Sequence, residues 1–281
     1  YLILADGAFG PRTSKTANGC ILFTPRQVVG VLDTTQAGRT AGEVLGYGGD
    51  IPVVGSITDG LALGPTVLLI GIAPSGGRLP PHWHAMLAEA IDGGLSIWSG
   101  LHTFIGDDPD LAARARTKGV EIRDVRRPPA ELPVSTGRVR DVAATVVLTV
   151  GSDCNIGKMT AALRVRDALV AQGVRVAFAG TGQTGIFIDG KGIAVDAVVA
   201  DFIGGAAEQL VLDAARDADI VLVEGQGSII HPGYSGVTYG LIHGSLPHGL
   251  VLCTQPSRTT ITHNDWVPIP PLAGLIALHD A

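Results

Sequence analysis

The stretch from Thr145 to Leu163 reads TVVLTVGSDCNIGKMTAAL, and it restricts the possible folds more than any other part of the chain. An apolar run is followed by a loop between Gly151 and Gly157, and Lys158 then opens a run of helix-forming residues. In such a strand, loop and helix, the free N–H groups of the first helical turn, the helix dipole and the lysine all face one anion. The stretch therefore predicts a phosphate-binding loop in an α/β domain, rather than an ordinary glycine-rich turn.

The loop departs in two places from the common phosphate-loop pattern GxxxxGK[ST]. Gly151 comes one residue earlier than the pattern requires, and Ser152 takes the expected glycine position. Met159 follows Lys158, and the hydroxyl is delayed to Thr160, which points about 100° further round a helix. In P-loop NTPases the hydroxyl beside the lysine holds Mg²⁺, which Met159 does not do, and the sequence does not decide whether Thr160 replaces it. We therefore expect a loop that holds a phosphate-bearing ligand rather than hydrolysing one.

We name this segment, Gly151–Thr160, the phosphate loop. A thiol near a helix N-terminus and a lysine favours the thiolate, so an acyl-cysteine intermediate at Cys154 is conceivable. The simpler interpretation, which we favour, is that Cys154 is a small residue beside the phosphate. The candidate ligand-binding residues of the phosphate loop are Gly151, Ser152, Asp153, Cys154, Asn155, Ile156, Gly157, Lys158, Met159 and Thr160.

Composition excludes several classes of protein. The 281 residues are 46% hydrophobic and carry a net charge of −6 without a basic block, which argues against nucleic acid as the main partner. The three cysteines are far apart and form no CxxC pair, so neither a disulfide framework nor a zinc site is expected, and a cytoplasmic setting fits. No apolar run reaches the roughly 18 residues that span a bilayer, so no membrane partner is expected.

The alternation of strand and helix signals predicts two α/β domains. It runs through the first 125 residues, as is typical of an open and mostly parallel sheet, and stops at a segment with three prolines. We therefore predict a Rossmann-like α/β domain over residues 1–125, a linker over 126–141 and a P-loop NTPase-like α/β domain over 142–281, both with mostly parallel sheets.

Individual elements are predicted from apolar runs, caps and glycine stops. A polar loop is expected over Gly7–Gly19, another over Thr181–Gly185, and irregular chain over Thr259–Pro271. The predicted strands are Tyr1–Ala5, Gln27–Asp33, Ile51–Val54, Thr66–Ala73, Leu95–Trp98, Val120–Val125, Thr145–Gly151, Val174–Ala179, Asp219–Glu224 and Gly249–Thr254. The predicted helices are Pro81–Gly93, Asp108–Gly119, Lys158–Gln172, Gly204–Ala218 and Pro271–His279.

Three side chains are candidates for proton transfer. Glu224 ends an apolar strand, at the carboxyl edge of the sheet where ligands bind in α/β folds, although strand-end acids are also often simply exposed. Asp201 is an acid among apolar residues before a helix, where it would act either on a substrate or as the N-cap. His231 lies on the polar loop after Glu224 and is either solvated or functional.

Polar residues on neighbouring loops are candidates for substrate binding. Arg12 and Lys15 lie on the first glycine-bounded loop and would suit a carboxylate, unless they are simply solvated. Other hydroxyl, amide and phenol groups lie on the loops that follow two of the predicted strands. They would reach the edge of the sheet where the ligand binds, or would cap their own loops. These residues are Thr181, Gln183, Thr184, Gln226, Ser228 and Tyr234.

Several motifs together resemble one bacterial family. They read SKTANG, GSDCNIGKMTAAL, TGQTGIFIDGKGIAVDAVVADFIGGAAE and VEGQGSIIHPGYSGVT. The chain resembles a family long described as a domain of unknown function and is similar to D-glutamate N-acetyltransferases, while the phosphate loop also resembles the GTDTxVGKT loop of dethiobiotin synthetase. The family resemblance implies acetyl-CoA as donor, a small amino acid as acceptor, a place in D-amino-acid catabolism and a phosphate loop that holds CoA.

These observations lead to one hypothesis and two alternatives. We expect acetyl transfer from acetyl-CoA to the amine of a small acidic amino acid, which the resemblance implies is D-glutamate. We expect it without a metal ion, with Glu224, Asp201 and His231 as candidate bases in that order, in a homo-oligomer. An ATP- and Mg²⁺-dependent ligase or kinase would instead place Glu224 and Thr160 on the metal. A nucleotide-sensing module without chemistry is the third possibility.

Overall fold

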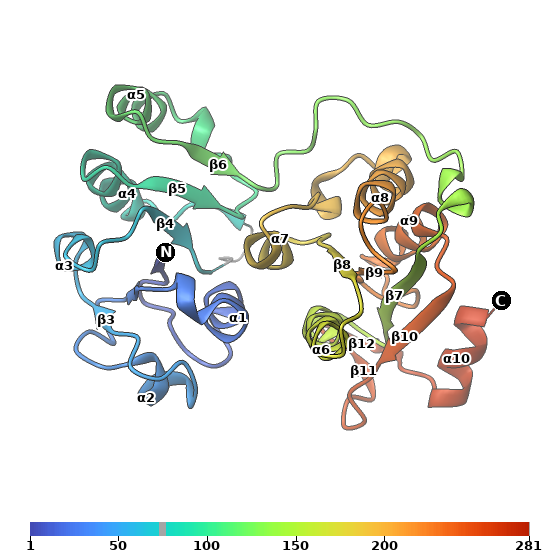
Figure 1. Ribbon diagram of the computed structural model, residues 1–281. Helices are drawn as coiled ribbons and strands as arrows, with labels where there is room; N and C mark the ends of the chain where they lie inside the picture. The colour runs from blue at the N-terminus through green and yellow to red at the C-terminus, as the bar shows by residue number, and fades with distance from the viewer. Residues whose placement is uncertain (73–76, 281) are drawn as a thin grey trace. The chain divides into compact units, whose positions relative to one another are not determined.

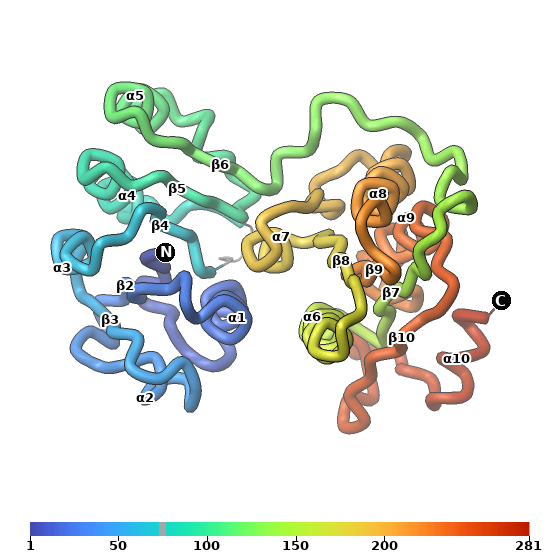
Figure 2. Tube along the Cα trace, viewed as in Figure 1, coloured from blue at the N-terminus to red at the C-terminus, as the bar shows by residue number. Residues whose placement is uncertain are grey.

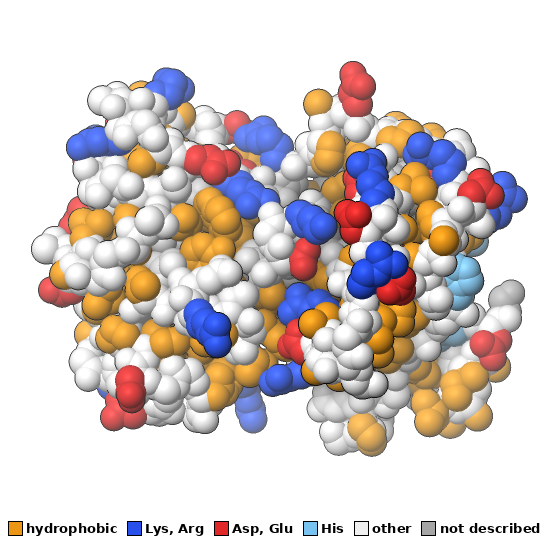
Figure 3. Space-filling view, viewed as in Figure 1, with side chains coloured by type: hydrophobic (Ala, Val, Ile, Leu, Met, Phe, Trp, Pro, Cys, Tyr) orange, Lys and Arg blue, Asp and Glu red, His pale blue; other side chains and the backbone are white. Residues whose placement is uncertain are grey.

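The computed structural model describes residues 1–72 and 77–280 (Figures 1 and 2). The chain divides into two compact units, Tyr1–Arg127 and Pro128–Ala281. Within the described residues, no helix combines the length and the apolar character needed to cross a membrane. On the face shown in Figure 3, Lys and Arg side chains are interspersed with Asp and Glu.

The first unit is built on a six-stranded parallel sheet with the order β3-β2-β1-β4-β5-β6. The order reverses between β1 and β4, which is the doubly wound arrangement of Rossmann folds and confirms the predicted Rossmann-like domain. The strand predicted over Thr66–Ala73 is β4, although Ala73 lies outside the described residues. The strands are β1 (Leu2–Leu4), β2 (Gly30–Leu32), β3 (Val53–Val54), β4 (Val67–Ile70), β5 (Ser96–Ser99) and β6 (Ile122–Asp124).

Capping residues set the ends of one helix of this unit as predicted. Asp108 Oδ1 accepts N–H bonds from Asp110 and Leu111 at 3.0 Å, and Gly119 ends the helix with a φ of 68°. These are an N-cap and a left-handed C-terminal stop. The helices of the unit are α1 (Lys15–Phe23), α2 (Ala41–Leu45), α3 (Ile57–Leu61), α4 (Trp83–Asp92) and α5 (Pro109–Lys118).

The predicted loop over Gly7–Gly19 is wrong in its second half, because Lys15 opens α1. Ala17, Cys20 and Ile21 bury their side chains along this helix. Burial of these small and apolar residues outweighs the weak helix propensity of the segment. Helix α3 was not predicted either.

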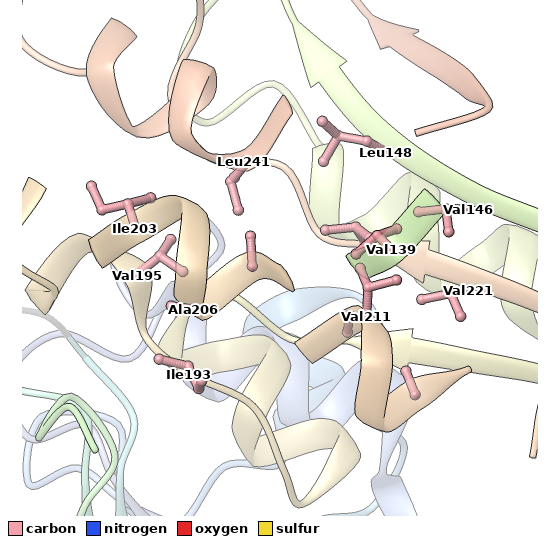
Figure 4. Packing of buried hydrophobic residues seen from close by; sticks show 14 of the residues in the cluster. Val139, Val146, Leu148, Ile193, Val195, Ile203, Ala206, Val211, Val221 and Leu241 are labelled. Carbon is pink, nitrogen blue, oxygen red and sulfur yellow. The ribbon is translucent and has the colours of Figure 1, made fainter. Parts of the chain in front are cut away.

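The second unit contains a four-stranded parallel sheet with the order β10-β7-β9-β8. Strand β7 lies inside the sheet between β9 and β10, so the phosphate loop leaves from the middle of the carboxyl edge. The sheet packs on a core that includes Val146, Leu148, Val211, Val221 and Leu241 (Figure 4). The strands are β7 (Thr145–Gly151), β8 (Val176–Ala179), β9 (Ile220–Val223) and β10 (Gly249–Cys253).

Elements of this unit differ from the prediction, and the helix predicted over Gly204–Ala218 begins earlier, at Ala200, so that it includes Asp201. The expected loop over Thr181–Gly185 ends early, because α7 begins at Gln183. Helix α9 was not predicted. A Cβ at Gly240 would lie 2.4 Å from Ile203 Cγ2, and one at Gly244 would lie 2.1 Å from the carbonyl oxygen of Gly204 in α8. These glycines therefore permit close packing of α9 on α8. The helices are α6 (Lys158–Val170), α7 (Gln183–Asp189), α8 (Ala200–Ala214), α9 (Ser235–Ser245) and α10 (Leu272–Asp280).

Two further segments are more ordered than the sequence predicts. Part of the proposed linker packs against α8, where a Cβ at Gly205 would lie 1.6 Å from the carbonyl oxygen of Pro133. The segment expected to be irregular contains an antiparallel hairpin of β11 (Thr260–Ile261) and β12 (Asn264–Pro268). Both segments gain their order from contacts with residues far away in the sequence.

Candidate active site

The phosphate loop has the geometry of an anion-binding loop. Strand β7 ends at Gly151, where a Cβ would lie 2.5 Å from Ile156 Cδ1, and α6 begins at Lys158 after Gly157 with a φ of 98°. The ammonium group of Lys158 donates a hydrogen bond of 2.7 Å to the carbonyl oxygen of Asp153. The lysine side chain therefore folds back onto the loop from the N-terminus of α6.

Ser152 supplies an independent observation that a ligand belongs in this loop. Its side chain is buried, and its Oγ has no hydrogen-bond partner within residues 1–72 and 77–280. Buried hydroxyls nearly always have partners, and the first N–H groups of a helix have none within the helix. A phosphate at the start of α6 would satisfy both kinds of group, so the residues present fit a phosphate-bearing ligand.

Asp153 fastens the phosphate loop to the segment after β10. Its Oδ2 accepts from the N–H of Thr262 at 2.9 Å, from the hydroxyl of Thr262 at 2.8 Å and from Arg258 Nη1 at 2.8 Å. Burial acts to raise the pKa of Asp153, but these hydrogen bonds outweigh it and lower the pKa below its ordinary value. Asp153 is therefore ionised, and we call its contact with Arg258 and Thr262 the clamp.

Arg258 is a second cation that contacts the phosphate loop, in addition to Lys158. Its Nη1 donates to Asp153 and also to the carbonyl oxygen of Cys154, both at 2.8 Å. A guanidinium carries further N–H groups on Nε and Nη2, which suit a phosphate. Sequence reasoning missed both residues: Arg258 lies just before the segment expected to be irregular and Thr262 lies within it, each more than 100 residues after Asp153. No local pattern in the sequence pairs them with it.

The two residues behind the predicted lack of magnesium chemistry differ in burial. Met159 is half-buried and Thr160 is exposed in the first turn of α6. Whatever their burial, the residue directly after Lys158 carries no hydroxyl group. The interpretation that the phosphate loop holds a ligand without a metal ion stays a prediction.

Glu224 directly follows β9 and is buried within a backbone network. Its Oε2 accepts from the N–H groups of Thr181 at 3.0 Å and Gly182 at 3.1 Å, so it satisfies donors at the start of α7. A Cβ at Gly185 would lie 2.3 Å from the same oxygen, which explains the glycine. Thr181 Oγ1 donates to the Glu224 carbonyl at 2.6 Å and accepts from Gln226 Nε2 at 3.2 Å. The structure thus brings Glu224, Thr181 and Gln226 together.

The remaining acidic candidate has a different environment. Asp201 is exposed in the first turn of α8, where its charge complements the helix dipole. Its interpretation as the N-cap is wrong, because the N-cap is Val199. In the first unit, Arg12 is exposed, and Lys15 is exposed at the first position of α1.

The substrate candidates on the second unit occupy three environments. Gln183 and Thr184 belong to the first turn of α7 rather than to a loop, and Thr184 is buried. Ser228 is fully buried, and its Oγ accepts from the N–H of Ile230. Tyr234 is 54% exposed and therefore accessible.

His231 is the candidate that lies beside the phosphate loop. Its side chain is buried, and one of its ring nitrogens lies within 4.8 Å of an Asp153 oxygen and of Cys154 Sγ. The ring packs on Tyr234, with centroids 4.5 Å apart, and its Nδ1 accepts from the N–H of Gly233 at 3.0 Å. Sequence reasoning ranked this residue last among the three candidate bases.

The same three residues have spacing that would suit a metal ion. Among the described residues, Asp153, Cys154 and His231 place one ligand atom each within 4.8 Å of the others. However, Arg258 Nη1 already occupies Asp153 Oδ2 at 2.8 Å, and its positive charge opposes a second cation there. We therefore assign no metal to this cluster.

Comparisons with known proteins agree on both units. The family model described as "Domain of unknown function (DUF1611_C) P-loop domain" matches residues 133–281, and the "Domain of unknown function (DUF1611_N) Rossmann-like domain" matches residues 34–128. A crystal structure of a DUF1611 family protein from Anabaena variabilis is similar with a TM-score of 0.91 at 40% identity, over 99% of this chain and 80% of that one.

Two curated relatives carry the same printed name, D-glutamate N-acetyltransferase. The protein from Tritonibacter scottomollicae is 38% identical over 261 residues, which are 92% of this chain and 74% of the relative. The protein from Pseudoalteromonas sp is 40% identical over 204 residues, which are 73% of this chain and 60% of the relative. These matches confirm the resemblance drawn from the motifs: the chain belongs to the DUF1611 family, with a Rossmann-like and a P-loop domain.

Proposed function

We propose that this chain is an N-acetyltransferase that moves an acetyl group from acetyl-CoA to the amine of D-glutamate, in D-amino-acid catabolism. The names of its two curated relatives support the acetyl transfer and the acceptor. The proposal that acetyl-CoA is the donor rests on the phosphate loop. There the buried Ser152 Oγ lacks a partner among the described residues, and Met159 takes the position after Lys158 where P-loop NTPases have the hydroxyl that binds Mg²⁺. This combination suits a phosphate-bearing ligand that is held and not hydrolysed.

The phosphate loop would hold the pyrophosphate of CoA. The N–H groups at the start of α6, the Ser152 hydroxyl and the cations of Lys158 and Arg258 would each contribute to the anion site. CoA supplies the acetyl thioester, and its pantetheine arm, with two amide groups, separates the thioester from the pyrophosphate. The acceptor therefore belongs at the far end of that arm and not in the loop.

Acetyl transfer requires two protons to leave the nitrogen of the acceptor. The ammonium group of D-glutamate must first lose a proton to a base, and the amine then attacks the thioester carbon. The resulting oxyanion needs N–H donors. As it collapses to the amide, the nitrogen gives up its second proton and the sulfur of CoA leaves as the thiol. Glu224 remains our first candidate base and Asp201 the second. Arg12 and Lys15 remain candidates for the carboxylates of the acceptor.

The rival function is that of a ligase or kinase that uses ATP and Mg²⁺. It needs a metal-binding carboxylate and hydroxyl beside the phosphates, whereas Glu224 Oε2 accepts two backbone N–H bonds and Thr160 is exposed. These two observations favour transfer over the rival.

Two measurements test the proposal. Thiol release from acetyl-CoA is followed with D-glutamate, L-glutamate and a panel of other amines, and calorimetry compares CoA in EDTA with ATP in Mg²⁺. We expect turnover with D-glutamate and CoA binding without metal. The variant Lys158→Met should weaken CoA binding about 10- to 100-fold, because a charged hydrogen-bond donor is lost. Binding of ATP with Mg²⁺ but not of CoA would refute the proposal, and CoA binding without turnover on any amine would point to a sensor.

A further inference from the structure

The hydrogen bond at His231 Nδ1 fixes where its ring can donate. Nδ1 accepts from the N–H of Gly233 at 3.0 Å. A neutral imidazole has one donor and one acceptor nitrogen, and the partner of one nitrogen sets the role of the other. With Nδ1 as acceptor, the proton of the neutral ring sits on Nε2. His231 therefore offers a ligand an N–H donor.

The loop around His231 holds this orientation in place. The backbone N–H of His231 donates to the carbonyl oxygen of Ser228 at 3.0 Å, and its own carbonyl accepts from Tyr234 at 3.3 Å and from Ser235, which opens α9, at 3.0 Å. The tilted ring of Tyr234 packs on the imidazole. The side chain of His231 is only 5% exposed. The donor is thus set by the fold before any ligand arrives.

Apart from the phenol of Tyr234, which packs on the ring, the charged and titratable groups that the structure places near His231 belong to the phosphate loop and to Arg258. Asp153 and Cys154 each place an atom within 4.8 Å of a ring nitrogen, and Arg258 is bound to both residues. Ser152, which precedes them, carries the buried hydroxyl that lacks a partner among the described residues. His231 is therefore a neighbour of the anion site.

A general base would need different chemistry. A base accepts a proton on a free lone pair, which Nε2–H does not have and which Nδ1 already uses for Gly233. For this reason His231 suits the recognition of the donor better than the reaction itself.

We infer that His231 binds the anionic end of the acyl donor, by donating its Nε2–H to a phosphate oxygen, and is not the base of the reaction. This inference rests on the proposed function for the identity of the donor, CoA. It requires no change in protonation during catalysis. It leaves Glu224 and Asp201 as the candidate bases.

Two variants at this position separate the roles. A glutamine amide nitrogen reaches as far as Nε2, whereas an asparagine amide reaches only as far as Nδ1. We expect His231→Asn to raise the Kd for CoA and for inorganic pyrophosphate about 10- to 100-fold, as for the loss of a hydrogen bond to a charged group. His231→Gln should stay close to the native protein in Kd. For His231→Asn, the loss should appear as a raised KM for acetyl-CoA rather than as a comparable loss of kcat.

Each outcome separates this inference from the proposed function. A loss of kcat in both variants with unchanged Kd for CoA would make His231 a base and overturn the inference. If the native protein binds pyrophosphate but not CoA, and His231→Asn weakens that binding, the anion role stands and the proposed function fails. If neither compound binds the native protein, the inference fails as well.

The tautomer is measured without any ligand or turnover. With ¹⁵N-labelled histidine, the ring nitrogen shifts and couplings of His231 show which nitrogen carries the proton, and His231→Gln assigns the signal. We expect the proton on Nε2. A proton on Nδ1 would remove the hydrogen bond to Gly233 on which the inference depends and would overturn it.

Discussion

Glu208 on α8 offers a sharp test of how the second unit is held together. The carboxylate is fully buried and accepts five hydrogen bonds. Its Oε2 accepts from the hydroxyl of Ser135 and from the N–H groups of Thr136 and Gly137, at 2.7 to 2.8 Å. Its Oε1 accepts from the hydroxyl of Thr136 and from Arg138 Nε, at 3.1 and 2.7 Å. One buried charge thus fastens the segment that joins the two units onto α8.

The pKa of Glu208 gives the magnitude of this interaction. Burial acts to raise the pKa, but hydrogen bonds from Arg138 and from residues 135–137 outweigh it and lower the pKa from 4.5 to about 2. The difference between these values corresponds to about 3 kcal/mol of stability at pH 7. Because the Arg138 side chain is 53% exposed, solvent screening reduces this to roughly 2–3 kcal/mol.

The variant Glu208→Gln should therefore lower the free energy of unfolding of the second unit by roughly 2–3 kcal/mol. Glutamine has one acceptor oxygen, so in either orientation its NH₂ group faces donors. The matched control is Glu131→Gln, which removes an exposed carboxylate from the same segment and should change stability by less than about 0.5 kcal/mol.

The pH dependence has a definite sign. The folded pKa of Glu208 lies below the unfolded value, so the stabilisation is fully present above pH 4.5 and is lost as the pH falls toward 2. The difference between native protein and Glu208→Gln should shrink by about 1 kcal/mol between pH 7 and pH 3.5. Hydrogen exchange in urea, read peptide by peptide, measures each unit separately. A difference that is absent at pH 7, or that does not shrink on acidification, would refute the reasoning.

Three other substitutions test the site. Gly185→Ala should destabilise the second unit by about 1–3 kcal/mol in urea unfolding, because its Cβ would lie 2.3 Å from Glu224 Oε2. The control Gly236→Ala in α9 meets no atom within 4 Å and should be neutral or slightly stabilising. Equal effects of the two variants on stability would contradict the steric argument. Arg258→Lys should weaken CoA binding about tenfold in calorimetry with unchanged circular dichroism, since lysine lacks the guanidinium fork, and native affinity would argue against a phosphate contact. Cys154→Ser should keep near-native turnover, while an acetyl-enzyme seen by mass spectrometry of the native protein would revive the acyl-cysteine.

The sequence predicts those parts of the fold whose signals are local. Strand β7, the phosphate loop and the start of α6 occupy adjacent positions, and the ends of α5 follow from Asp108 and Gly119, so each was readable from neighbouring residues. The parallel order of strands in both units also follows from alternating strands and helices. Such features need no knowledge of distant contacts.

The remaining parts depend on contacts between distant residues. Helix α9 is stable because its glycines pack on α8, which no local propensity reveals. Among the candidate bases, the position of Glu224 at the end of a strand favoured it. The sequence does not show that backbone N–H groups bind its Oε2 or that His231 lies beside Cys154. Tertiary packing decides these points.

The clamp at Asp153 makes the phosphate loop a late product of synthesis. A ribosome releases Asp153 more than 100 residues before it releases Arg258 and Thr262. Until then Asp153 has neither of these partners, and β7 lacks its neighbour β10 until Cys253 has emerged. A ligand arriving during translation would therefore meet an unfinished loop, and the anion site becomes complete only once Thr262 has left the ribosome.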